Sequence, residues 1–120
     1  MTGRLTTHVL DISRGLPAIG INIELFQIIG PDGGKESIKK VITDKDGRVE
    51  EALLEGNTLR LGVYELLFFA GDYYRDLGLI EEQDILFDRI PIRFKVSDEQ
   101  AHYHIPLLTA PGGYSTYRGS

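Results

Sequence analysis

The chain has no cysteine and only three histidines among its 120 residues. Without cysteine it forms neither disulfides nor thiolate sites, so any catalytic chemistry must use other side chains. Its net charge of −5 argues against nucleic acid as a partner, because nucleic acids are bound by clustered lysines and arginines. No apolar run approaches the roughly 20 residues that span a bilayer, and the first residues lack the apolar stretch of a secretory signal. These absences predict a cytoplasmic protein without a membrane partner.

Short segments with a two-residue period dominate what is there. Alternating apolar and polar positions between turn signals predict strands. We expect strands over residues 4–12, 19–29, 37–43, 61–69, 90–96, 102–109 and 114–118, and a short strand at most over 48–51. Pro91 indicates that the strand over 90–96 is an edge strand or begins there. Such a series of short strands is typical of an all-β sandwich or barrel, and the length fits one domain over residues 1–120.

One segment, residues 70–79, departs from the strand pattern. Gly71 and Asp72 are suited to cap a helix there. Tyr74 and Leu77 would then share one helix face, with Tyr73 beside them. The sequence therefore predicts one short helix in an otherwise all-β protein.

Two of the histidines lie two residues apart near the C-terminus. In a strand, His102 and His104 point to the same face and Tyr103 points to the other. His8 lies near the other end of the chain, so a fold that joins the two ends gathers all three imidazoles. Three histidines can hold zinc. Two solvated histidines on a sheet face are the alternative, because the flanking carboxylates are poorly placed to orient the imidazoles.

Two arginines and the last residues add polar groups to this set. Alone, Arg48 and Arg118 each fit an ordinary surface arginine. Together with histidines, which move protons near neutral pH, they are suited to hold a planar anion. Tyr117 or Ser120 would add a hydroxyl. There is no Gly-x-Ser-x-Gly elbow and no phosphate-binding loop, so the residues themselves predict a β-sandwich with a His/Arg site.

Four segments together resemble one family, the transthyretin-related proteins that act as 5-hydroxyisourate hydrolases. They read Leu-Thr-Thr-His-Val-Leu-Asp at 5–11, Thr-Asp-Lys-Asp-Gly-Arg at 43–48, His-Tyr-His-Ile-Pro-Leu-Leu at 102–108 and Tyr-Ser-Thr-Tyr-Arg-Gly-Ser at 114–120. Gly-Leu-Pro-Ala at 15–18 also fits, and the likeness runs nearly end to end. The final Tyr-Arg-Gly-Ser separates the hydrolases from transthyretin, the thyroid-hormone carrier.

The resemblance implies a transthyretin-like two-sheet β-sandwich of about eight strands with one short helix. It implies a homotetramer, a dimer of dimers, with sites at the dimer–dimer interface. The substrate would be 5-hydroxyisourate, the product of urate oxidation, and the reaction would open its ring without a cofactor or catalytic metal. Carried over to this sequence, the catalytic residues are His8, Arg48 and His104, and the substrate-binding residues are His102, Tyr117, Arg118, Gly119 and Ser120.

Two other functions stand as alternatives. One is a carrier of small aromatic ligands of the transthyretin type, which would have no need of paired imidazoles. The other is a three-histidine metal site. The sequence also leaves open which histidine is the general base and what His102 does.

Overall fold

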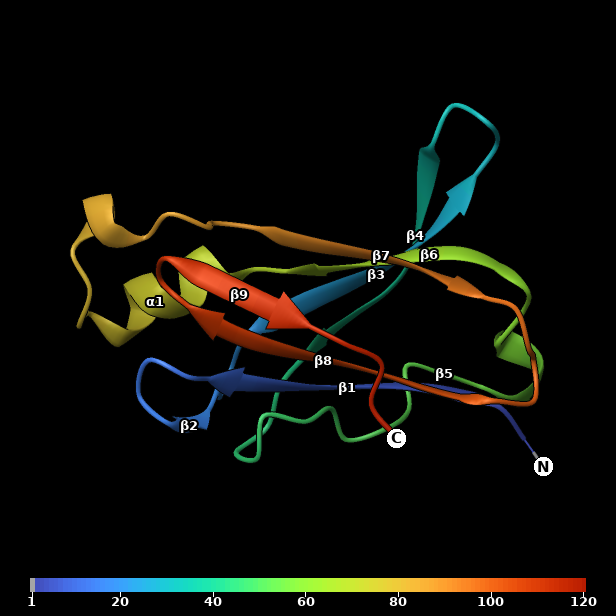
Figure 1. Ribbon diagram of the computed structural model, residues 1–120, viewed down its shortest axis with the longest axis horizontal. Coiled ribbons are helices and arrows are strands. Elements are labelled where there is room, and N and C mark those ends of the chain that lie inside the picture. Colours follow the sequence, from blue (N-terminus) through green and yellow to red (C-terminus); the bar gives the residue numbers. More distant parts are fainter. Residues whose placement is uncertain (1) are drawn as a thin grey trace.

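In a computed structural model that describes residues 2–120, the chain forms two β-sheets that pack on one another, with one α-helix at one end (Figure 1). The strands are β1 (Arg4–Asp11), β2 (Leu16–Pro17), β3 (Asn22–Ile29), β4 (Gly34–Ile42), β5 (Leu54–Glu55), β6 (Gly62–Phe68), β7 (Ile90–Val96), β8 (His102–Ala110) and β9 (Gly113–Thr116). The helix α1 spans Ala70–Leu77, and two 3-10 helices are η1 (Gly56–Thr58) and η2 (Glu82–Asp84). The expected two-sheet fold with one helix is confirmed. No helix within residues 2–120 is long and apolar enough to cross a membrane.

The strand order brings the two ends of the chain together. One sheet has the order β2-β1-β8-β9, with β5 also paired to β1, and the other has the order β4-β3-β6-β7. The strand β7 lies at an edge, as Pro91 predicts. β1 and β8 run parallel along the whole of β1, whereas the other paired strands are antiparallel. The first and the penultimate strand of the chain therefore lie side by side in the middle of one sheet.

The burial pattern of β1 shows how the sequence separates the inside of the sandwich from the outside. Leu5, Thr7, Val9 and Asp11 are buried, and the residues between them are half-exposed or exposed. The buried aliphatic side chains join one apolar cluster with residues of the second sheet such as Leu25. Each such side chain contributes about 1.5–3 kcal/mol when fully buried. The core thus uses one face of β1 and leaves the other face for polar side chains.

The helix begins at Ala70, as the sequence predicts, but its N-cap residue and its end differ from the prediction. Its N-cap is Phe69, not Gly71 or Asp72, and it ends at Leu77. It stops there because Gly78 takes a left-handed φ of 68°, which favours glycine. The rings of Tyr73 and Tyr74 are both buried, with their centroids 5.0 Å apart in an edge-to-face contact.

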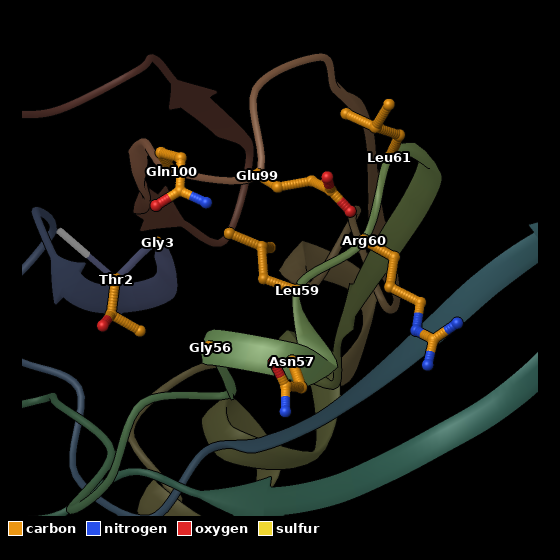
Figure 2. Close-up of a pocket in the computed structure, with 9 residues that line it drawn as sticks. All are labelled: Thr2, Gly3, Gly56, Asn57, Leu59, Arg60, Leu61, Glu99 and Gln100. Atoms are coloured by element: carbon orange, nitrogen blue, oxygen red, sulfur yellow. The ribbon is translucent and has the colours of Figure 1, made fainter.

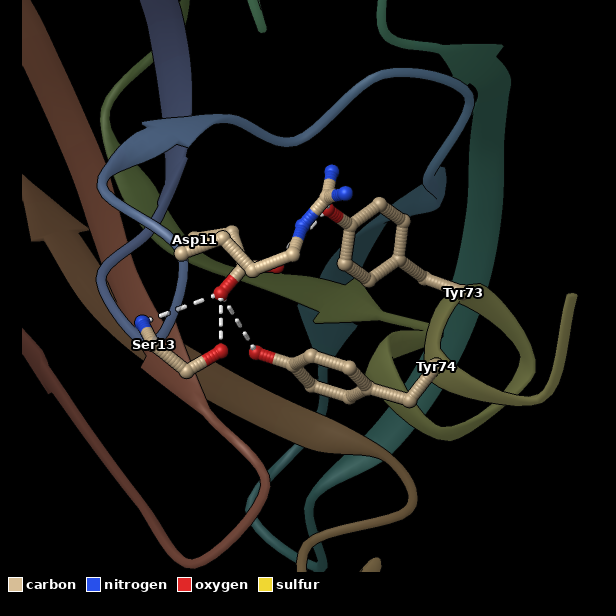
Figure 3. A network of polar contacts seen from close by, with 5 residues as sticks. Asp11, Ser13, Tyr73 and Tyr74 are labelled. Carbon is tan, nitrogen blue, oxygen red and sulfur yellow. Dashed lines mark hydrogen bonds and ion pairs between the residues drawn. The ribbon is translucent and has the colours of Figure 1, made fainter. Parts of the chain in front are cut away.

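The helix tyrosines reach a buried carboxylate at the end of β1 (Figure 3). Asp11 accepts hydrogen bonds from the hydroxyls of Tyr73 at 2.9 Å and Tyr74 at 3.4 Å. It also accepts the N–H and O–H of Ser13 and the Nε–H of Arg14. Burial by itself raises the pKa of Asp11, but these donors outweigh it and hold the pKa below its ordinary value. The network ties the end of β1 to α1.

Several expected boundaries differ from the structure. The strand expected over residues 19–29 begins only at Asn22, because Gly20 turns the chain with a φ of 77° and leaves Ile19 exposed. Residues 48–51 form no strand; only Arg48 makes an isolated β-bridge. The strand expected over 114–118 begins one residue earlier and ends at Thr116. The two-residue strands β2 and β5 were not predicted, because two residues are too few to show a periodic pattern.

Candidate active site

Parallel pairing of β1 with β8 places the three histidines on one face of the sheet, which we call the histidine face. In this register Thr6 lies directly opposite His104. Both His102 and His104 contact the Thr6 hydroxyl, while Tyr103 between them is buried on the other side. His8 follows two residues after Thr6 and is likewise half-exposed. The outer face of two adjacent strands thus carries every imidazole of the protein.

A tight turn brings Arg48 beside β1. The carboxylate of Asp44 accepts the backbone N–H groups of Asp46 and Arg48 at 2.9 and 3.1 Å. Gly47 follows with a φ of 74°, and a side chain at this position would collide with the backbone of β1. Arg48 then pairs with His8 in an isolated antiparallel bridge. The Asp-Lys-Asp-Gly sequence before Arg48 is therefore what sets the arginine next to the histidine.

The last residues lie against β8, at the edge of the histidine face opposite to Arg48. Gly119 donates its backbone N–H to the carbonyl of His104 at 2.7 Å, and the two residues form an isolated bridge. A Cβ on Gly119 would lie 2.5 Å from Cδ2 of the His104 imidazole, so only glycine allows the approach. Arg118 donates to the carbonyl of His102 at 3.3 Å, and its guanidinium lies over the ring of Tyr103 at 4.4 Å. Arg118 in this way holds the C-terminal segment against β8.

Three of the sequence-predicted side chains have hydrogen-bonding groups that remain unused. The guanidinium of Arg48 and the hydroxyls of Tyr117 and Ser120 are exposed. Within residues 2–120, none of the three side chains has a hydrogen-bond or ion-pair partner. A planar, permanently charged guanidinium with free N–H groups is suited to hold an anion.

The hydrogen bond of His8 fixes where its ring proton lies. His8 Nε2 is 2.9 Å from the backbone carbonyl oxygen of Asp46. Because a carbonyl oxygen only accepts, Nε2 carries the proton of the neutral ring and Nδ1 keeps a free lone pair. His8 therefore has one nitrogen held by the Arg48 turn and one available for proton transfer.

The electrostatics of the histidine face favour neutral imidazoles on β8. Burial lowers the pKa of His104, and the positive charge of Arg48 and the imidazoles of His102 and His8 lower it further. Burial also lowers the pKa of His102, with added effects from the charges of Arg4 and Arg118. A neutral imidazole keeps one lone pair, so His104 is prepared to accept a proton at neutral pH.

Sequence reasoning missed Thr6, which belongs to the histidine face. Its hydroxyl oxygen lies 2.7 Å from His102 Nε2 and 2.8 Å from His104 Nδ1. The only signal in the sequence is its place two residues before His8, which puts both on one face of a strand. That signal becomes informative only when the register with β8 is known.

The three imidazoles do not converge on a common point that would suit a metal ion. Among residues 2–120, no three His, Cys, Asp or Glu side chains are grouped to hold one. His102 and His104 instead each turn one ring nitrogen to the hydroxyl of Thr6.

A hollow of about 730 Å³ lies elsewhere on the molecule (Figure 2). It lies where the start of β1, η1 and the turn before β8 meet, and it is lined by Thr2, Gly3, Gly56, Asn57, Leu59, Arg60, Leu61, Glu99 and Gln100. None of the sequence-predicted site residues is among them. The hollow and the histidine face are therefore separate surfaces.

Comparison with known proteins places the chain in a family. Residues 5–119 match the model of the HIUase/Transthyretin family. The 5-hydroxyisourate hydrolase of Halalkalibacterium halodurans is 49% identical over 121 residues, which cover 100% of both chains. The solved 5-hydroxyisourate hydrolase of Klebsiella pneumoniae is 35% identical with a TM-score of 0.80, over 98% of this chain and 99% of that chain.

Transthyretin itself shares the fold at lower identity. Sea bream transthyretin, solved in complex with thyroxine, has a TM-score of 0.84 at 24% identity, over 97% of this chain and 94% of that chain. At 24% identity this likeness shows the fold alone, whereas the family model over residues 5–119 and the relative with 49% identity show the family. The chain therefore belongs to the HIUase/Transthyretin family.

Proposed function

We propose that the protein hydrolyses 5-hydroxyisourate to 2-oxo-4-hydroxy-4-carboxy-5-ureidoimidazoline, a step in urate and purine catabolism. The relative that is 49% identical over the full chain is a 5-hydroxyisourate hydrolase. One structural observation carries the proposal for the site: His8 pairs with Arg48 and His104 pairs with Gly119, on the same sheet face. Two imidazoles and a free guanidinium therefore lie together on an accessible surface.

The reaction needs three kinds of assistance, and the histidine face holds groups of each kind. Water attacks a ring carbonyl, a C–O bond forms, and the ring C–N bond then breaks. A base must take the proton of the water, an acid must protonate the departing nitrogen, and developing negative charge must be stabilised. We assign the proton transfers to His8 and His104, and the binding and charge stabilisation of the anionic ring to Arg48.

Five further residues are proposed to bind the substrate: His102, Tyr117, Arg118, Gly119 and Ser120. The approach of Gly119 to the His104 imidazole supports this assignment for the C-terminal segment. The hydroxyls of Tyr117 and Ser120 are exposed and suited to contact a polar ring. Arg118 is held at the carbonyl of His102, so its first contribution is to keep this segment on β8.

A carrier of small aromatic ligands is the second candidate, because transthyretin shares this fold. The free Arg48 guanidinium and the half-exposed imidazoles favour the hydrolase, since a carrier gains nothing from groups suited to proton transfer. Sequence identity supports the same choice, at 49% with a hydrolase and 24% with transthyretin.

We further propose that the single domain assembles as a homotetramer, a dimer of dimers, with the histidine face at the interface between dimers. The histidine face is open, so a second copy would supply the walls that enclose a substrate. Exposed aliphatic side chains occur beside this sheet, at Ile12, Leu16 and Ile19. Within the described residues, β9 and β7 end their sheets and have a free edge. Light scattering that gave a fully active monomer would contradict this proposal.

The direct test of the activity is to generate 5-hydroxyisourate in situ with urate oxidase and to follow the decay of its ultraviolet absorbance. The protein should accelerate the decay of that signal in proportion to its concentration. A carrier would slow the decay or leave it unchanged. The cytoplasmic location and the absence of a cofactor stay predictions from the sequence.

A further inference from the structure

The Thr6 hydroxyl sits between two imidazoles that come from the neighbouring strand. Its oxygen is 2.7 Å from His102 Nε2 and 2.8 Å from His104 Nδ1, both within strong hydrogen-bond range. The ladder holds the residue in place, because Thr6 pairs directly with His104 in the β1–β8 register. Threonine is also stiff at χ1, so the hydroxyl has few other positions to adopt. The two contacts are therefore features of the sheet itself.

The tautomers of His102 and His104 depend on each other, because both rings bond to the single hydroxyl of Thr6. A hydroxyl has one proton to donate and accepts through its lone pairs. If both rings are neutral and both bonds form, one ring donates to Thr6 and the other accepts from it. Either His104 carries its proton on Nδ1 and His102 accepts at Nε2, or His102 carries its proton on Nε2 and His104 accepts at Nδ1.

The role proposed for His104 as a proton acceptor requires the first arrangement. Nδ1 is occupied by Thr6, so the other nitrogen, Nε2, is the one left for chemistry, and among residues 2–120 it has no hydrogen-bond partner. The positive charge of Arg48 acts on this ring. That charge helps to keep the ring neutral near pH 7, so one of its two nitrogens carries a lone pair. The arrangement with the proton on Nδ1 leaves that lone pair on Nε2.

We propose that Thr6 is a positioning residue that holds His104 in the Nδ1–H tautomer, by accepting from His104 Nδ1–H and donating to His102 Nε2. His104 Nε2 is then free as the proton acceptor. His102 acts through Thr6, as the acceptor at the far end of the chain of hydrogen bonds. This logic, in which the partner of one ring nitrogen fixes the state of the other, is common to functional histidines. The inference rests on the proposed function for its kinetic part, and its tautomer part can be measured without substrate.

The experiment compares three variants of the full-length protein by nitrogen-15 NMR of the histidine rings and by ring-opening kinetics. Thr6→Val removes the hydroxyl and keeps the shape and the strand preference. Thr6→Ser keeps a hydroxyl. Thr7→Val is the matched control, because its hydroxyl bonds the carbonyl of Ile105 on the buried face of the same strand. With only three histidines in the chain, each ring can be assigned.

The proposal predicts a specific pattern in the wild-type spectra. His104 and His102 should both be protonated at Nδ1, and His8 at Nε2, the internal reference set by its bond to the carbonyl of Asp46. Thr6→Val should shift His104 towards Nε2–H and leave His8 unchanged. Thr6→Ser should keep the wild-type pattern, and Thr7→Val should lower the melting temperature without changing any tautomer.

The kinetics should follow the tautomers. Thr6→Val should lower kcat by roughly ten- to a hundredfold, a loss of the size found when the hydrogen-bond partner of a metal-binding imidazole is removed. KM should change little, and Thr6→Ser should restore most of kcat. Unchanged tautomers in Thr6→Val, a wild-type His104 protonated at Nε2, or full activity of Thr6→Val would each overturn the proposal. If the wild-type protein does not open 5-hydroxyisourate, the proposed function fails, and the spectra still decide the tautomers.

Discussion

The two faces of β1 each carry a polar cluster, and the clusters differ in how far their hydrogen bonds are satisfied. On the inner face, Asp11 is fully buried and accepts from four neighbouring side chains and one backbone N–H. On the outer face, His8 and His104 are half-exposed, and the guanidinium of Arg48 beside them has no partner within residues 2–120. Each cluster is built on a residue of the same eight-residue strand, the inner one on Asp11 and the outer one on His8.

The difference teaches how to tell a structural polar cluster from a functional one. A buried carboxylate is tolerated only when its hydrogen bonds are made, so a saturated network such as that of Asp11 has nothing left to offer a ligand. The histidine face keeps free donors and lone pairs in a place where water can satisfy them until a substrate does. We therefore assign stability to the inner cluster and chemistry to the outer one, and the following changes test this division.

The largest effect is expected from removing residues 117–120. The truncated protein should lose ring-opening activity, because the Gly119 bridge to His104 and the hydroxyls of Tyr117 and Ser120 disappear together. Its loss of stability should be small, about 1 kcal/mol, since these residues bury little apolar surface. Melting temperature and rate measured on the same preparation check this. A loss of stability large enough to explain the loss of rate would make the segment structural.

Replacing either histidine should be nearly as severe for the rate. His104→Ala and His8→Asn should each lower turnover by roughly 10²–10⁴-fold, the usual contribution of general acid–base assistance. The fold should persist, because both rings lie on the outer face and contribute little to the core. A near-wild-type rate in either variant would remove that residue from the mechanism.

On the inner face, Asp11→Ala should act on stability instead. It leaves the hydroxyls of Tyr73 and Tyr74 without their acceptor, and we expect the free energy of unfolding to fall by about 3 kcal/mol. Because the folded-state pKa of Asp11 is lowered, its contribution is present above the ordinary aspartate pKa and is lost as pH falls through the folded value. Denaturant titrations should show this acid dependence in the wild type and a weaker one in the variant.

Arg48→Lys is expected to have an intermediate effect on the rate. Lysine keeps the charge but loses the planar fork, and kcat/KM should fall by roughly ten- to a hundredfold, the worth of a charged hydrogen bond. Arg48→Gln distinguishes the effect of charge from that of side-chain geometry. Unlike Arg48→Lys, it removes the positive charge that lowers the pKa of His104. The NMR titration of His104 should therefore move to higher pH in Arg48→Gln and stay in place in Arg48→Lys. Full activity of Arg48→Lys would rule out bidentate binding.

The smallest effect is expected from chelation. EDTA should leave the rate unchanged, because His102 and His104 direct one nitrogen each to Thr6 and the three imidazoles share no common centre. Added zinc should inhibit by binding the free imidazole nitrogens. Loss of activity with EDTA that one particular metal restores would favour the metalloenzyme alternative.

Sequence patterns predicted the parts of the molecule that depend on local period. The alternation around Tyr103 gave the common face of His102 and His104, and Pro91 gave the edge strand β7. Residue chemistry grouped Arg48 and residues 117–120 with the histidines, but only the family resemblance gave each of them a role, because turns and chain ends carry no period.

Long-range pairing is what the sequence did not predict. The carboxylate of Asp11 and the hydroxyl of Tyr73 are 62 positions apart, and Thr6 and His104 are 98 positions apart. A threonine on a strand has no distinguishing pattern until its neighbour across the ladder is known. The prediction that Ile19 lies in a strand failed for a different reason. The apolar alternation continues through Gly20, but the turn at Gly20 is set by backbone conformation and not by hydrophobicity.

The most direct test of the division between the two faces is one joint measurement on His104→Ala and Asp11→Ala. The free energy of unfolding and the initial rate of 5-hydroxyisourate decay would be determined for both variants and the wild type in the same buffer. We predict opposite losses: His104→Ala loses turnover and keeps its stability, whereas Asp11→Ala loses stability and keeps its rate per folded molecule. Parallel losses of rate and stability in both variants would contradict the assignment of chemistry to the outer face of β1.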